Sequence, residues 1–275
     1  MSPDPLRLSP HAPGATPSLS DADARLPDHV EVDKEKLDHE LDELTERLDA
    51  LQRRLHAEGA KAVLVVLQGR DASGKDGTLR KVFGPLDPLG VTTTSFKAPT
   101  DEERRHDFLW RIHHAVPGRG TIGVFNRSHY EDVLVVRVRK LVPESVWRPR
   151  YEQINLFERI LVENGAVILK FLLHISREEQ RERLLERLND PEKYWKFNAN
   201  DLAERDLWDQ YTEAYREALA RTSSEAAPWY VVPADSKRVR DVLVARTMVE
   251  TLERMNPQWP GPPPELKALR AALRR

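Results

Sequence analysis

The stretch Gly69-Arg70-Asp71-Ala72-Ser73-Gly74-Lys75-Asp76 follows directly on the apolar run Ala62-Val63-Leu64-Val65-Val66-Leu67. A buried strand, a glycine-rich turn and a helix that begins near Lys75 are the context of a phosphate-binding loop, in which backbone N–H groups and a lysine surround phosphate oxygens. The spacing GxxxxGK fits, but Asp76 stands where a Ser or Thr normally holds Mg²⁺. The alternative is a glycine-rich β–α turn with a solvated lysine. The flanking strand and helix favour the phosphate loop.

The composition excludes several classes of protein. The chain has 275 residues and a net charge of −2, so a polyanion site must be a local concentration of Lys and Arg, and general nucleic-acid binding is disfavoured. There is no cysteine, which rules out disulfides, thiol nucleophiles and Cys-ligated zinc. The sequence shows no signal-peptide pattern and no run long enough to span a membrane. We therefore expect a soluble, cytoplasmic protein without a nucleic-acid or membrane partner.

Two tails and one helix flank the predicted core. Residues 1–29 contain six prolines among Ser, Ala and Asp, which predicts a mobile tail, and the proline-rich residues 257–275 form a second tail. In residues 30–58, leucines recur every three or four positions, which predicts an amphipathic helix. We expect this leucine seam to pack on its own domain. The alternative is a subunit contact, as in a homo-oligomer such as a dimer or tetramer.

The core, residues 59–256, alternates strand and helix patterns. Strands are expected at residues 62–68, 91–96, 121–125, 167–175 and 229–233. Capping-box pairs at Thr100 with Glu103 and at Ser176 with Glu179 predict helices over 101–115 and 177–188. The alternation predicts an α/β fold with a parallel sheet covered by helices on both faces. Ligands should gather at the C-terminal ends of the strands, where the phosphate loop lies.

Several residues near the loop are suited to phosphoryl transfer. Asp71 lies inside the loop, where a carboxylate is costly unless a cation bridges it to phosphate, so it is a candidate Mg²⁺ ligand or a group that orients the attacking phosphate; the alternative is a turn-capping residue. Arg127 follows the third strand and should act as a clamp on the transferred group. Asn126 stands where an Asp usually holds the metal's water shell. Glu131 and Asp132 are candidate replacements, or simply acids in the first turn of a helix.

The predicted helix 177–188 segregates its charges. Gln180, Arg183 and Arg187 share one flank, as a polyanion would require, although a salt-bridged surface is an equal alternative. Residues 191–198 mix aromatics and lysines, which fits either a lid over phosphates or a loop anchored by Trp195. A lid formed by these segments would cover about residues 177–205.

A second cluster lies at and after the second strand. Nucleotide kinases of this architecture place the acceptor nucleotide there, and an aromatic side chain with a cation suits a base and its phosphate. Lys97, Trp110 and Arg111 are therefore candidate nucleotide-binding residues, while Trp110 can equally belong to the core. The three histidines His106, His113 and His114 show no metal-ligand spacing.

Several separated blocks resemble the second family of polyphosphate kinases. They are Gly69–Gly77, Ser95–Thr100, Phe108–Arg111, Phe125–Leu134, Trp195–Phe197 and Ala227–Asp235. The resemblance covers about residues 30–258. It implies a P-loop kinase fold like that of thymidylate kinase, with a helical lid, and Mg²⁺-dependent transfer of the terminal phosphoryl group of inorganic polyphosphate to a nucleotide, with Mn²⁺ as a substitute metal.

The resemblance also assigns roles. The family's loop Asp and Lys fall on Asp71 and Lys75, and its arginine after the third strand falls on Arg127. The form Asn-Arg-Ser-x-Tyr-Glu-Asp resembles the subgroup that accepts both AMP and ADP, with polyphosphate synthesis as the reverse reaction. Asn126 replaces an Asp of many members, so Asp71 is the first choice for the metal ligand, Glu131 the second, with Asn126 beside them.

Phosphate or polyphosphate should be bound by Gly69, Arg70, Gly74, Lys75, Asp76, Gly77, Arg183, Arg187 and Lys193.

Two rival functions remain. The first is an ATP-dependent nucleoside or nucleotide kinase on the same fold, and Asp76 counts against it. The second is a non-catalytic oligomerising protein that binds nucleotide, and the intact Lys75 and Arg127 count against it.

Overall fold

One parallel sheet organises the protein. The computed structural model describes residues 6–198 and 200–274. The five strands lie in the order β2-β3-β1-β4-β5 and all neighbours are parallel. They are β1 (Ala62–Gln68), β2 (Val91–Ser95), β3 (Ile122–Asn126), β4 (Ala166–His174) and β5 (Trp229–Pro233). Every predicted strand is confirmed, with ends that differ by at most one residue.

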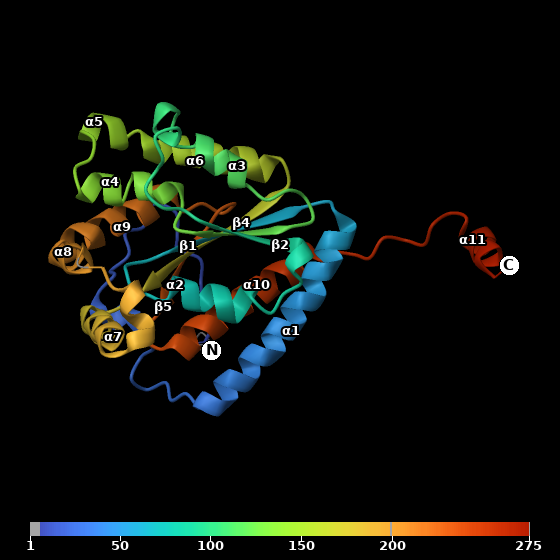
Figure 1. Ribbon diagram of the computed structural model, residues 1–275, viewed down its shortest axis with the longest axis horizontal. Helices are drawn as coiled ribbons and strands as arrows, with labels where there is room; N and C mark the ends of the chain where they lie inside the picture. The colour runs from blue at the N-terminus through green and yellow to red at the C-terminus, as the bar shows by residue number, and fades with distance from the viewer. Residues whose placement is uncertain (1–5, 199, 275) are drawn as a thin grey trace.

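Helices cover both faces of the sheet (Figure 1). One face packs against α1 (Lys34–Glu58), α2 (Lys75–Thr78) and α10 (Lys237–Met255), and the other against α3 (Trp110–Ala115), α6 (Arg150–Glu163) and α9 (Trp208–Thr222). The P-loop kinase fold predicted from the sequence is confirmed. The chain also contains α4 (Val135–Val138), α5 (Glu144–Trp147), α7 (Arg177–Asn189), α8 (Asn200–Asp206) and α11 (Leu266–Leu273). Within the described residues, no helix combines the length and apolar character needed to cross a membrane.

The leucine seam of α1 is covered by the same chain. Leu48 and Leu55 are fully buried, and the seam belongs to one apolar cluster with residues of α10 such as Val242 and Leu252. The interpretation as a helix packed on its own domain is therefore confirmed. A homo-oligomer stays a prediction, but this seam does not supply the contact.

The helix predicted over 101–115 is wrong. The structure has a short 3₁₀ turn, Glu103–Arg105, and a separate helix α3, because His106 between them is extended. The capping pair does form, since Thr100 Oγ1 accepts the Glu103 N–H at 3.2 Å, but it caps only one turn. Asp107 then caps a new turn by accepting the Leu109 N–H at 2.9 Å. A capping motif marks where a helix starts and does not fix its length.

Residues 6–29 lie along the core, which differs from the mobile tail that the prolines indicate. Leu19 and Ala24 are buried. The Asp235 N–H donates to Ala24 O at 3.0 Å, and His174 Nε2 lies 2.8 Å from Ser20 O. Prolines favour an extended chain, and an extended chain can lie on a domain surface as readily as in solvent. The segment thus closes one side of the sheet near the ends of β4 and β5.

Candidate active site

The phosphate loop follows β1, whose seven residues are all buried. Gly69 and Gly74 have φ values of +156° and +103°, which strain any residue with a side chain. A Cβ on Gly69 would also lie 2.7 Å from Leu173 O, and one on Gly74 would overlap the Arg240 guanidinium. Lys75 begins α2 directly after the loop. Both glycines are therefore required by backbone conformation and by close packing.

Side chains from α7 and α10 hold the loop's carbonyl groups. Gln180 Nε2 donates to Asp71 O at 2.9 Å, and Arg183 Nη1 donates to Ala72 O at 2.9 Å and Ser73 O at 3.3 Å. Arg240 Nη1 lies 3.4 Å from the same Ser73 O. Carbonyl oxygens repel phosphate, so directing them toward buried donors favours anion binding in the loop.

Lys75 is almost fully buried, and its ammonium group bonds to the loop itself. Lys75 Nζ donates to Gly69 O at 2.7 Å and to Arg70 O at 3.1 Å. Burial, together with the charge of Arg127, lowers the pKa of Lys75 to about 8. A bound phosphate would favour the charged form and oppose this effect.

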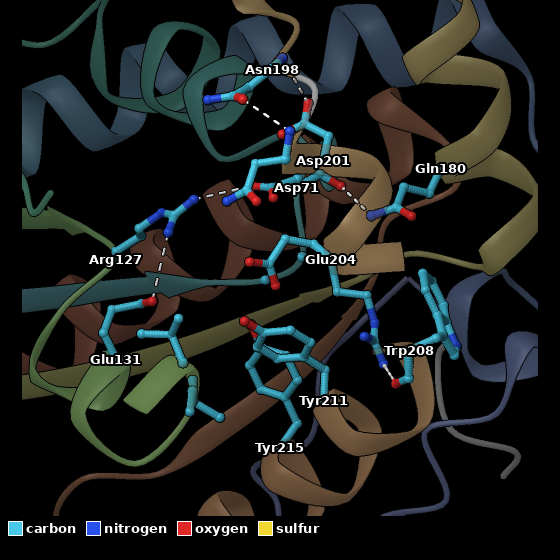
Figure 2. Close-up of a pocket in the computed structure, with 15 residues that line it drawn as sticks. Asp71, Arg127, Glu131, Gln180, Asn198, Asp201, Glu204, Trp208, Tyr211 and Tyr215 are labelled. Carbon is cyan, nitrogen blue, oxygen red and sulfur yellow. Dashed lines mark hydrogen bonds and ion pairs between the residues drawn. The ribbon is translucent and has the colours of Figure 1, made fainter. Parts of the chain in front are cut away.

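Arg127 lies between two carboxylates. Its Nη2 is 3.0 Å from Asp71 Oδ1 and its Nη1 is 3.6 Å from Glu131 Oε2 (Figure 2). Glu131 is the main cause of a raised pKa at Arg127, so the guanidinium stays charged. Nearby, Asn126 Nδ2 donates to Asp76 Oδ1 at 2.8 Å. The loop, the end of β3 and the turn after it thus meet at one point.

One cavity beside this point is strongly basic. It has a volume of about 510 Å³ and is called the basic cleft below. Its lining includes Lys75, Arg80, Arg127, Arg183, Arg187, Lys193, Lys196 and Lys237, together with Asp71, Asp76 and Glu186. Eight cationic side chains against three carboxylates give the local positive charge that the chain as a whole lacks.

A second cavity, of about 300 Å³, is lined by aromatic and acidic side chains and is called the aromatic cavity (Figure 2). Among its lining residues are Arg70, Asp71, Arg127, Glu131, Asp201, Glu204, Trp208, Tyr211 and Tyr215. The three aromatic residues lie on one stripe of α9, at helical spacing. Asp71 and Arg127 line both cavities.

Several predicted phosphate ligands have other partners in the structure. Arg183 is 7% exposed, and besides the loop it donates to Ala234 O and Asp235 O, both at 2.7 Å. Arg70 points into the aromatic cavity, with its guanidinium carbon 3.8 Å from the Trp208 ring centroid. Arg187 and Lys193, also predicted to bind polyphosphate, line the basic cleft, where Arg187 lies 3.5 Å from Asp201 and Lys193 lies 3.0 Å from Glu186. Their role as ligands stays a prediction.

The predicted nucleotide-binding residues have partners outside both cavities. Arg111 Nη1 donates to Lys97 O at 2.8 Å, and Trp110 stacks on His106 with ring centroids 4.2 Å apart. None of the three lines either of the two cavities within the described part of the chain. Asp132 is likewise turned away from a metal role, since its carboxylate pairs with Arg150 at 2.9 Å.

Sequence reasoning missed two groups of lining residues. Arg80 and Lys237 in the basic cleft are single cations without a motif. Trp208, Tyr211 and Tyr215 have the three- and four-residue spacing of any buried helix stripe. The tyrosine hydroxyls were the available signal, because a hydroxyl on a buried stripe needs a hydrogen-bond partner.

The fold and the loop define a phosphotransferase of the P-loop kinase class. The family model for Polyphosphate kinase 2 (PPK2) matches residues 31–260. The chain is 56% identical over 219 residues to an AMP/ADP-polyphosphate phosphotransferase of Meiothermus ruber, across 80% of this chain and 82% of that one. It is 46% identical to an ADP-polyphosphate phosphotransferase of Rhodopseudomonas palustris, across 80% of each chain. The crystal structure of Polyphosphate Kinase 2 from Arthrobacter aurescens TC1 superimposes with a TM-score of 0.85 at 40% identity, across 97% of this chain and 98% of that one. The chain belongs to the polyphosphate kinase 2 family.

Proposed function

We propose that the protein transfers the terminal phosphoryl group of inorganic polyphosphate to AMP and to ADP, and that Mg²⁺ assists. Family membership supports this reaction, and one geometric feature supports its location: Asp71 and Arg127 line both cavities. An acceptor phosphate oxygen in one cavity attacks the terminal phosphorus of a chain in the other. The P–O–P bond breaks, and the chain leaves one phosphate shorter.

The basic cleft suits the donor. A polyphosphate chain is a uniform repeating anion without a base, and the lining of the cleft is mostly cationic, with Trp195 as its one aromatic residue among those described. Lys75 and Arg127 would neutralise charge on the phosphoryl group as it moves. A uniform chain can slide until its end meets either a short or a long acceptor, which is the physical basis for one site serving both AMP and ADP.

The aromatic cavity suits the acceptor nucleotide. Among the aromatic residues of the lining, Tyr211 is the most exposed and can contact a base, whereas the Trp208 ring is covered by the Arg70 guanidinium and Tyr215 is buried. The carboxylates of Asp201 and Glu204 can accept hydrogen bonds from ribose hydroxyls. A volume of about 300 Å³ is in the range of small-molecule sites. The cluster of Lys97, Trp110 and Arg111 is the second candidate position. Tyr211→Ala should raise the KM for AMP more than Trp110→Ala does; the opposite order would favour the cluster.

The residues around Arg127 fit Mg²⁺. Asp71 and Glu131 supply carboxylates and Asn126 an amide oxygen, which are ligands that Mg²⁺ accepts. Among the described residues, no three acidic or histidine side chains form a ready metal cluster. That agrees with an ion bound through one or two carboxylates together with substrate phosphates and water. When bound, Mg²⁺ would offset the phosphates' negative charge.

The test uses the purified protein with AMP, polyphosphate and Mg²⁺, without ATP. The time course should show ADP first and then ATP, and pure ADP should also be converted to ATP. Accumulation of ADP without any conversion of added ADP would restrict the acceptor range to AMP. Turnover with ATP as donor but none with polyphosphate would instead establish the rival ATP-dependent kinase.

A further inference from the structure

Arg127 holds an unusual backbone conformation. Its φ is +63°, in the left-handed region that favours glycine, and such a residue persists only when its surroundings fix it. The next residue, Ser128, is extended, and its Oγ lies 3.1 Å from Gln68 Nε2 and accepts the Tyr130 N–H at 3.2 Å. A 3₁₀ turn, η5 (His129–Asp132), then carries Glu131.

Below this turn lies a buried group of charged and polar side chains. Lys170, in the middle of β4, is fully buried, and its Nζ donates to Glu158 Oε2 at 2.6 Å and to Tyr130 OH at 2.9 Å. Tyr130 OH in turn donates to Glu158 Oε1 at 2.7 Å. His129 Nε2 lies 3.3 Å from the same oxygen, and because a carboxylate can only accept, the imidazole donates. We call Lys170, Glu158 and Tyr130 the buried cluster.

The buried cluster also reaches the helix that carries the aromatic cavity. The third donated bond of Lys170 goes to Thr222 O, the last residue of α9, at 2.7 Å. Trp229 Nε1 donates to Thr222 Oγ1 at 2.9 Å, and the Trp229 ring packs edge-on against Tyr130 with centroids 4.7 Å apart. One ammonium group thus joins the turn beside Arg127, helix α6 and the C-terminus of α9.

We infer that the buried cluster positions Arg127: Lys170, Glu158 and Tyr130 hold the turn that keeps Arg127 in its left-handed conformation, aimed at the junction of the two cavities. This inference rests on the proposed role of Arg127 in transfer. None of the three residues lines either cavity, so they are positioning residues rather than catalytic ones. A buried charged pair is weak evidence for stability alone, because apolar replacements are often as stable. The function inferred for this pair is therefore to fix the position of the turn that carries Arg127.

The test is a double-mutant cycle between Tyr130→Phe and Arg127→Lys. Tyr130→Phe keeps the ring and removes the hydroxyl that links the turn to Glu158 and Lys170. We expect kcat to fall about tenfold while the KM values for AMP and polyphosphate stay within about twofold, because a small misplacement impairs the transfer step and not ground-state binding. In the double variant, kcat should equal that of Arg127→Lys alone, because Tyr130 acts only through the guanidinium.

Two further variants separate positioning from folding. Tyr151→Phe removes the hydroxyl of another buried tyrosine, which accepts a bond from Arg137 at 3.2 Å, and it should leave kcat unchanged. Lys170→Met with Glu158→Leu removes both charges together, so that neither is left unpaired; it should fold and show the same fall in kcat as Tyr130→Phe.

Unchanged kcat in either cluster variant, or fully additive losses in the cycle, would overturn the positioning inference while wild-type conversion of AMP still supports the proposed function. Unchanged kcat in Arg127→Lys would overturn both the role of Arg127 and the positioning inference. Absence of polyphosphate-dependent turnover in the wild type would contradict the proposed function itself.

Discussion

Arg183 and Arg187 lie one turn apart on α7 and both line the basic cleft, but they differ in burial and in partners. We call the buried lining residues, such as Arg183 and Lys75, the floor of the cleft, and the partly exposed ones, such as Arg187 and Lys193, its rim. Arg183 is buried and donates to four backbone carbonyls, two of them in the phosphate loop. Arg187 lies 3.5 Å from Asp201 and donates to Lys196 O at 3.2 Å. Beyond it, the 3₁₀ segment Pro191–Lys196 leaves Trp195 77% exposed. The base of the predicted lid is therefore part of the phosphate loop's support, and its tip is free to contact ligand.

The difference shows how one helix can serve two purposes. Groups of the floor have their hydrogen bonds satisfied inside the protein and cannot exchange them without cost. Groups of the rim have weaker partners: Arg187 lies 3.5 Å from Asp201, and Lys193 pairs with the half-exposed Glu186. A phosphate chain can displace such partners more readily. Substitutions in the floor should therefore change kcat or stability, whereas substitutions in the rim should change the affinity for polyphosphate.

The largest effect should come from Lys75→Ala at the floor. Lys75 is the cation at the junction of loop and helix, and loss of a comparable electrostatic contact typically lowers kcat about a hundredfold or more. The fold should remain, because the truncation takes donors only from Gly69 O and Arg70 O, and Arg70 O keeps the bond from the Ser73 N–H. Turnover with AMP and polyphosphate, together with circular dichroism, checks both parts. Near-normal turnover in a folded variant would contradict the phosphate-loop assignment.

Arg183→Ala should lower both stability and kcat. The truncation removes the side-chain donor from Ala72 O, Ala234 O and Asp235 O, while Ser73 O keeps Arg240, for a loss of roughly 2–4 kcal/mol in the free energy of unfolding. A thermal melt should shift down by several degrees, and kcat should fall with AMP and ADP alike because the loop is disturbed.

Arg181→Ala is the matched control for Arg183→Ala. Arg181 is on the same helix, half exposed, and bonded only to Glu178 and Glu182 among the described residues. It should leave the melting temperature and kcat unchanged. If Arg183→Ala raises only the KM for polyphosphate and leaves the melting temperature unchanged, then Arg183 is a polyphosphate ligand, as the charge pattern of the helix predicts.

The pH dependence should report Lys75. Its pKa of about 8 in the free enzyme means that above pH 8 a growing fraction of enzyme lacks this charge. We expect kcat/KM for polyphosphate, which reports the free enzyme, to fall about tenfold per pH unit above pH 8, while kcat at saturation stays level to a higher pH.

A pKa of Lys75 that is lowered on folding also means that the unfolded chain binds more protons between pH 8 and 10.5, so this group makes the free energy of unfolding rise with pH in that window. Lys75→Met should abolish that contribution; a slope that persists in the variant would assign it elsewhere.

The sequence predicted the sheet, the loop and the meeting of Asp71, Lys75 and Arg127, because local patterns determine each of them. It could not predict the partners of Arg183, since these carbonyls belong to residues about 50 and 110 positions away and a backbone oxygen has no residue type to recognise. The aromatic cavity was missed for a related reason: helix spacing does not distinguish a stripe that faces a core from one that faces a cavity. Composition indicated a mobile segment before residue 30, whereas burial of Leu19 and Ala24 depends on a surface that only the folded sheet creates.

Arg187→Ala should have the smallest effect and should act on affinity alone. Arg187 lines the basic cleft but donates to no residue of the phosphate loop among the described contacts. We expect the KM for polyphosphate to rise severalfold and to become less sensitive to salt, because one fewer cation of the basic cleft meets the chain. The KM for AMP and kcat should stay near wild type, because Arg187 lines the basic cleft and is not among the residues that line the aromatic cavity. The melting temperature should change little, because the ion pair that is lost, between Arg187 and Asp201, is long, at 3.5 Å. Combined with Arg183→Ala, the two effects should simply add, one in stability and rate, the other in polyphosphate KM. If Arg187→Ala instead lowers kcat as much as Arg183→Ala does, then the tip of α7 belongs to the floor as well, and the division drawn between the two arginines does not hold.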